Sequence, residues 1–296
     1  MRTLGSGALA LLLTVALSSP AAADETGAQL AQLLDKTAGS IVTVKVVVKT
    51  EIAMMGQSEE SRLDLKGVVV DASGLVMISN ADISADRMAS MLGGMGGGGG
   101  MDPGIKITPS DFKVVFGNEE KEYEGFLVAK DTELDLAFVA VKDLGDRKLT
   151  GISFETDAKP QVGQQVVGIS RTPKGFDYAP YFATGRVSGK IKKPRKAWMV
   201  DGNISTYGLP VFTMEGKVLG VLITLTPPTT DEAGGGLSGL MRMFRGGGGG
   251  SDGTFLLPAK SVKRLVTQSV EKAKELEAMS AEDAAEKDAG GEKSDG

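Results

Sequence analysis

The stretch that decides the fold reads DGNISTYGLPVFTMEGKVLGVLIT and covers residues 201–224. Gly208 and Pro210 frame a bend, and Glu215 and Gly216 form a second turn before an almost continuous apolar run. A run of Val, Leu and Ile bounded by turn residues is typical of a strand in the core of a sandwich or barrel. The stretch therefore predicts a short strand, a turn and a buried strand.

The composition limits the chemistry that is open to this chain. Its 296 residues suffice for one large β domain or two small domains with a real core. The net charge of −5 provides no overall field that would attract nucleic acid or an anionic membrane. The sequence contains neither Cys nor His, so it has no disulfide, no Cys/His zinc site and no imidazole base. We expect no cofactor, no metal and no nucleic-acid partner.

The two ends of the chain differ from the middle. An apolar run follows Arg2, and Ala21 and Ala23 have the spacing of a cleavage site, which predicts a signal peptide over 1–23 and a periplasmic or secreted protein that begins at Asp24. An uncleaved membrane anchor is disfavoured because the apolar run is shorter than the roughly 20 residues that span a bilayer. Residues 276–296 are rich in Ala, Glu, Asp, Lys and Gly, and we expect them to form a disordered acidic tail.

Between the ends, short β-branched runs alternate with turn residues. We expect a helix over 28–36, a loop over 54–61 and strands at 40–49, 67–79, 112–116, 123–129, 136–141 and 162–169. The strand pair within 67–79 bends at Ser73 and Gly74. Two Gly-rich insertions, at 87–104 and 234–253, contain too many glycines for a packed element.

Several of these segments resemble, in the same order, motifs of trypsin-like serine proteases of the HtrA type. Residues 67–80 are similar to the hairpin before the catalytic histidine, and KDTELDLA at 130–137 is similar to Asp-x-x-x-Asp-Leu-Ala. The resemblance covers about 28–270. It implies an all-β fold with two packed antiparallel β-barrels (trypsin-like, chymotrypsin fold) and short terminal helices. We place the trypsin-like domain at 24–275, with barrels at about 38–145 and 150–270, and expect no PDZ domain after it.

The resemblance also shows where the catalytic residues of that family would lie. Tyr207 occupies the nucleophile position, Ser205 replaces the glycine two residues before it, and Gly208 keeps its place. Asp135 occupies the position of the aspartate that orients the base. A phenol ionises far above neutral pH and needs a base or a metal to act as a nucleophile. The triad is therefore degenerate. The oxyanion loop at Ser205 and Gly208 is degenerate as well, because Ser205 replaces a glycine.

The position of the base depends on the alignment. It falls on Asp82 when counted from Asn80 and on Ala81 when counted from Gly74, and neither supplies an imidazole. Asp82 and Asp135 could form an acid/base pair or hold a hard cation such as calcium. We favour the simpler interpretation, in which Asp135 caps a turn and Asp82 is exposed.

These residues favour an exported, catalytically inactive HtrA-like protein that binds protein or peptide partners. The alternatives are an active serine-type endopeptidase with a rearranged site and a structural envelope protein without a ligand. The segment at 237–245 suggests a docking patch for a partner or a membrane, although a collapsed loop explains it equally well. Its apolar residues are Leu237, Leu240, Met241, Met243 and Phe244.

Overall fold

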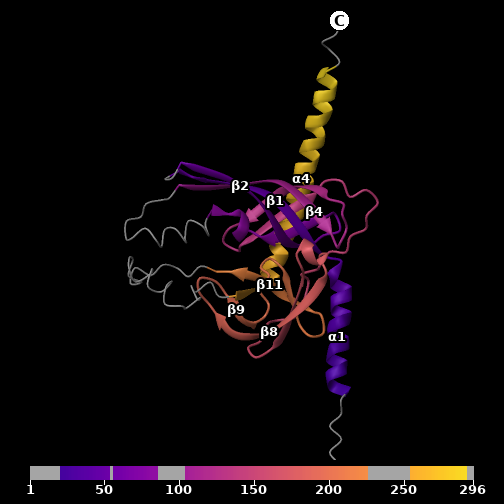
Figure 1. Cartoon of the computed structure of the whole chain (residues 1–296), viewed down its shortest axis with the longest axis vertical. Helices are drawn as coiled ribbons and strands as arrows, with labels where there is room; N and C mark the ends of the chain where they lie inside the picture. The colour runs from indigo at the N-terminus through magenta and orange to yellow at the C-terminus, as the bar shows by residue number, and fades with distance from the viewer. Residues whose placement is uncertain (1–20, 54–55, 86–103, 226–253, 292–296) are drawn as a thin grey trace, which may run out of the picture.

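A computed structural model of the chain describes residues 21–53, 56–85, 104–225 and 254–291. These residues form two closed barrels of antiparallel strands, one above the other in Figure 1, with a long helix near each end of the chain. The prediction of two packed trypsin-like barrels is confirmed. Among the helices of the described part, none is long and apolar enough to cross a membrane.

The first barrel is built from strands β1 to β6, which pair in the order β1-β2-β3-β6-β5-β4. Its interior is filled by the alternate side chains of each strand, including Val42, Val44 and Val46 of β1, because successive side chains of a strand point to opposite faces. The strand bounds are β1 Ile41–Ile52, β2 Gln57–Val69, β3 Leu75–Ser79, β4 Ile105–Phe116, β5 Tyr123–Asp131 and β6 Leu136–Val141.

The second barrel pairs its strands in the order β10-β11-β12-β9-β8-β7. The stretch at 201–224 forms the predicted short strand, turn and buried strand, and the Gly216 N–H donates to the Thr213 carbonyl at 3.0 Å to close the turn. The strand bounds are β7 Gln165–Arg171, β8 Pro180–Ile191, β9 Ala197–Gly202, β10 Pro210–Phe212, β11 Val218–Thr224 and β12 Thr254–Pro258.

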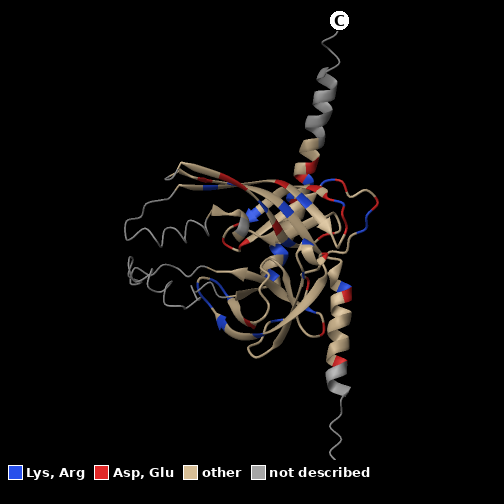
Figure 2. Cartoon of the chain, in the orientation of Figure 1, with Lys and Arg blue, Asp and Glu red and all other residues tan. Residues whose placement is uncertain are grey.

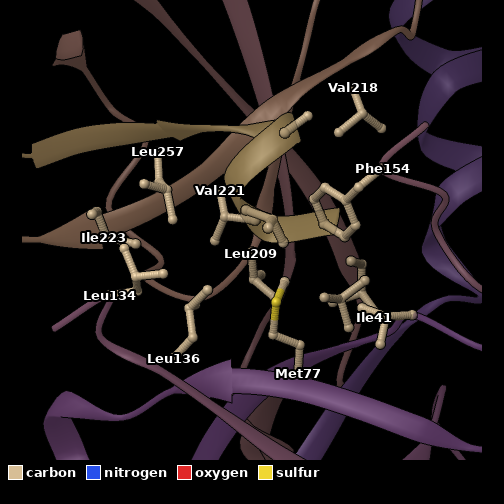
Figure 3. Close-up of a cluster of buried hydrophobic side chains, with 14 of the residues drawn as sticks. Ile41, Met77, Leu134, Leu136, Phe154, Leu209, Val218, Val221, Ile223 and Leu257 are labelled. Atoms are coloured by element: carbon tan, nitrogen blue, oxygen red, sulfur yellow. The ribbon is translucent and has the colours of Figure 1, made fainter. Parts of the chain in front are cut away.

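Each barrel has an apolar core of its own. A third apolar core lies between the two barrels and holds them together (Figure 3). Met77 and Leu136 reach it from the first barrel, and Leu209 and Val221 reach it from the second. Helix α1 (Ala21–Ala38) contributes Leu30, and helix α4 (Ala259–Gly291) packs against strands of both barrels. The segment at 201–224 therefore lies at the junction of the barrels, where a cleft can take residues from both.

Two expectations were wrong. The loop predicted over 54–61 is strand from Gln57 onward, because the β-branched strand β1 pairs with β2 along its whole length and imposes an extended shape on a polar sequence. The tail is helical to Gly291, since Ala, Glu and Lys are strong helix formers and α4 reaches it without interruption. Most of both Gly-rich insertions and the docking segment at 237–245 lie outside the described residues.

A buried arginine links α1 and the first barrel to the second. The Arg171 guanidinium donates to the carbonyls of Ala38 at 2.6 Å, Ile41 at 2.7 Å and Tyr178 at 2.9 Å. Burial lowers its pKa, although arginine stays charged at neutral pH. The link closes the C-terminal end of α1, where carbonyls lack partners within the helix.

Arg171→Met should lower the free energy of unfolding by about 3 kcal/mol, because buried carbonyls would lose their donors. Urea unfolding measures this change. The matched control is Arg186→Met, since Arg186 is exposed and donates to a single carbonyl, that of Gly163. Equal effects of the two substitutions would contradict a special role for Arg171.

Candidate functional site

Asp135 is the best-anchored polar side chain of the site. It precedes β6, has a left-handed backbone with φ of 55°, and is 7% exposed. Its Oδ2 accepts hydrogen bonds from Thr224 Oγ1 at 2.8 Å, Ser79 Oγ at 3.2 Å and the Thr224 N–H at 3.3 Å. Asp135 thus ties β3 of the first barrel to β11 of the second, and it also accepts from the backbone N–H of Ala81 at the start of the following 3-10 turn. The turn that precedes Asp135 is capped by Asp131, which accepts from the Leu134 N–H at 2.8 Å.

Burial is the largest influence on this carboxyl group and raises the pKa of Asp135, while the hydrogen bonds from Thr224, Ser79 and the Ala81 N–H oppose the rise. The folded protein therefore holds this proton more tightly than the unfolded chain. The contribution of Asp135 to stability is complete below the unfolded pKa and is lost as the pH rises through the folded pKa.

Asp135→Asn mimics the protonated form. The stability of this variant relative to the wild type should therefore be highest at neutral pH, where the wild-type carboxyl group loses its proton. The free energy of unfolding of the variant minus that of the wild type should fall as the pH is lowered from 7 to 3. Urea unfolding at a series of pH values measures this difference. The exposed Asp201 on β9 offers the control substitution Asp201→Asn; a difference that rises toward acid pH would contradict the sign.

The loop at 203–209 is fixed against both barrels by its glycine. Gly208 has φ of 78°, and its N–H donates to the Leu222 carbonyl at 2.8 Å. A Cβ on Gly208 would lie 2.3 Å from the Ser79 backbone nitrogen. The loop therefore approaches β3 more closely than any side chain permits, and this contact places Tyr207 beside the end of β3.

A pocket of about 240 Å³ opens between this loop and the first barrel. Ser79 and the segment at 64–66 of β2 line it on one side, and Ser205, Thr206 and Tyr207 line it on the other. Tyr207 is half-buried and packs against the core of the second barrel. The structure thus brings together Ser205, Tyr207 and, through Ser79, Asp135.

Among the described residues that line this pocket, Lys66 alone is basic. Its Nζ donates to Thr43 Oγ1 and to the Thr172 carbonyl, both at 3.2 Å, and lies 5.4 Å from the centre of the Tyr178 ring. Burial is the main cause that lowers the pKa of Lys66. The amine therefore bridges the two barrels, from Thr43 of the first to Thr172 of the second.

The remaining predicted position is Asp82, which lies in the short 3-10 helix η2 (Ala81–Ile83) directly after β3. Its side chain is outside the part that the structure describes.

Sequence reasoning missed Thr224, Ser79 and Lys66. Thr224 could have been noticed as the polar residue that ends the apolar run at 218–223, but only the folded chain shows that it faces Asp135.

The arrangement of the two barrels around this site agrees with the result of a comparison against known protein families. The profile described as "Trypsin-like peptidase domain" matches residues 66–221, from β2 into β11. No curated protein matches the sequence. The matched range covers more than half of the chain and includes Asp135, Ser205, Tyr207 and Gly208. Together with the two closed barrels, the match shows that the chain belongs to the family of trypsin-like peptidase domains.

Proposed function

We propose that this chain is an exported, catalytically inactive, HtrA-like member of the family that binds an extended segment of a protein or peptide in the cleft between its barrels. The proposal rests on the contrast between the scaffold of the site, which is intact, and its catalytic residues, which are missing. Gly208 holds the loop against β3 and Asp135 joins β3 to β11, while Tyr207 stands at the nucleophile position of a chain without histidine. A serine-type mechanism needs a nucleophile, a base and a group that orients the base.

The cleft supports binding independently of catalysis. The pocket presents three hydroxyl side chains of the loop and Ser79 opposite them. In the described part of the chain, the backbone N–H groups of Ser205 and Tyr207 donate no hydrogen bond to another backbone group. An extended peptide carries one carbonyl per residue and can accept from such groups.

Two assays test the proposal. A fluorophosphonate probe should not label the purified protein, and a casein-type substrate should remain intact. Display of a random peptide library should instead yield binders. Ser205→Trp should abolish their binding by filling the pocket from an exposed position, whereas Ser73→Trp, in an exposed turn of the first barrel, should leave it unchanged. Binding that survives Ser205→Trp would place the ligand elsewhere.

One observation favours the second candidate, an active serine-type endopeptidase with a rearranged site. Ser205 is exposed and lines the same pocket as Lys66, and a lysine with a lowered pKa can act as the base for a serine nucleophile. Labelling by the fluorophosphonate that is lost in both Ser205→Ala and Lys66→Met would establish this candidate and reject the inactive one.

The proposal of export has its own test. N-terminal sequencing of the protein from an envelope or secreted fraction should return Asp24, because Ala21 and Ala23 form the cleavage pattern. Recovery of Met1 or Arg2 from that fraction would reject it. We further propose that the segment at 237–245 contributes to partner docking. Its deletion should weaken capture of a folded protein that carries a selected peptide as an extended segment more than capture of the peptide alone.

A further inference from the structure

Strand β2 has an edge that no described strand covers. β1 pairs with β2 from Gln57 to Val68, whereas β3 pairs with it only at Gly67, Val68 and Val69. Continuing that register places Ser79, the last residue of β3, opposite Lys66. Within the described part of the chain, the edge is therefore open over 57–65, and in Figure 1 the β1–β2 hairpin projects from the first barrel. An uncovered edge is a template for another strand.

The open edge carries both signs of charge: Glu59, Glu60 and Asp64 are acidic and Arg62 is basic, and Figure 2 shows the acidic residues of the projecting hairpin in red. Glu60 and Arg62 lie on one face of β2, two residues apart, and both are exposed. Neither forms an ion pair with another described residue; the strand-pairing register places Glu60 opposite Lys49 and Arg62 opposite Val47. An edge of one sign would repel its own copy, but this edge carries both signs around its midpoint, Ser61.

The geometry points to pairing between two copies of this chain: we propose that β2 of one protomer adds in antiparallel fashion to β2 of a second, about a two-fold axis at Ser61. In this register the open edge of one copy, 57–65, pairs with the whole open edge of the other. Glu60 then stands opposite Arg62 of the second copy, twice by symmetry. Opposite charges directly across an antiparallel pair stabilise it, and like charges destabilise it.

Neighbouring registers are worse for identifiable reasons. An axis at Arg62 would set that residue against itself and Glu60 against Asp64, and an axis at Glu60 would set two glutamates together. An axis at Leu63 would pair Arg62 with Asp64, but it would also set residues 57–59 opposite 67–69, which already pair with β3, so only part of the open edge could pair. Ser61 is therefore the centre that satisfies both charge and space.

The pairing has a consequence for the cleft. Asp64 and Leu65 line the pocket beside Tyr207, and the proposed register places Ser58 and Gln57 of the second copy opposite them. The second protomer would thus add polar side chains to the rim of the site. This inference stands on the edge and its charges, and it holds whether or not the cleft binds peptides.

The absence of cysteine makes a cross-linking test clean. In the full chain, Ser61→Cys places two thiols directly across the axis, where paired Cβ atoms lie about 4.5–5.5 Å apart, close to the spacing that a disulfide needs. The control is Ser58→Cys, whose two copies would lie roughly 20 Å apart in this register. Under mild oxidation, we expect the Ser61→Cys variant to form covalent dimers at least ten times faster than the control.

Charge exchange tests the same register without oxidation. Arg62→Glu and Glu60→Arg should each weaken the dimer about tenfold or more, as measured by sedimentation equilibrium, because attractive pairs become repulsive. An equimolar mixture of the two variants restores both pairs and should dimerise as tightly as the wild type. Unchanged circular dichroism of each variant would show that the fold is intact.

Three results would overturn the proposal. The first is a wild-type chain that stays monomeric at about 100 µM, well above the dissociation constants of weak specific dimers. The second is equal cross-linking of Ser61→Cys and Ser58→Cys. The third is a dimer whose affinity is unaffected by Arg62→Glu, which would place the interface on another surface.

Discussion

Gly208→Ala should lower the free energy of unfolding by about 3 kcal/mol or more. Two effects add. The backbone of Gly208 has φ of 78°, which L-residues rarely adopt. The new methyl group would also meet the Ser79 nitrogen at 2.3 Å and the Ile78 carbonyl carbon at 2.7 Å, and backbone atoms of a buried strand cannot move aside cheaply.

A matched control separates the two effects. Gly163 has a similar φ of 89°, but a Cβ there would meet no atom within 4 Å. Gly163→Ala should therefore cost only the backbone strain, about 1 kcal/mol. Urea unfolding of both variants measures the difference, which is the cost of pushing the loop away from β3. Equal losses in the two variants would show that the close approach of Gly208 to β3 has no energetic weight.

Much of the fold could be predicted from the sequence because the patterns that specify its strands and turns are local. Residues 136–141 are all apolar, and residues 218–223 are apolar apart from Gly220. Both segments are strands buried on both faces. A strand needs such a pattern when one face fills a barrel and the other packs against a neighbouring barrel. The turns at Gly74 and Gly216 are equally local, since each needs a positive φ.

The contacts between distant segments could not be predicted in this way. The Thr224–Asp135 and Arg171–Ala38 contacts join residues far apart in the sequence, and no local pattern specifies such pairs. The first part of β2, from Gln57 to Ser61, was predicted as a loop because its polar residues follow no strand-like alternation. These residues are extended only because they pair with β1. The site was located through Asp135 and Tyr207, but its pocket and Lys66 required the folded chain.

Restoring one catalytic residue should not create a protease. Tyr207→Ser supplies a hydroxyl without a base, and Asp82→His supplies a base without a nucleophile, so each variant should hydrolyse a casein-type substrate no faster than buffer. The residues of a triad act as a unit, and their effects on rate are strongly non-additive. Hydrolysis by the wild type that Tyr207→Phe abolishes would refute inactivity itself.

The combination of Asp82→His, Tyr207→Ser and Ser205→Gly, with Asp135 kept, is the smallest set that rebuilds every part of the mechanism. We expect this triple variant to become labelled by a fluorophosphonate at position 207, because Asp135 is already held between Ser79 and Thr224 where it can orient an imidazole. Position 82 is preferred for the histidine, since Ala81 is only 9% exposed and leaves little room for a ring.

Two controls connect that gain to the geometry of the site. Adding Asp135→Asn to the triple variant should remove most of the activity while keeping the packing, because the amide no longer holds the imidazole in its productive tautomer, an effect of roughly 10⁴-fold in serine proteases. Moving the histidine to position 81 should give no labelling. Labelling that persists without the Asp135 carboxylate would show that the contacts of Asp135 support the fold but not the orientation of a base.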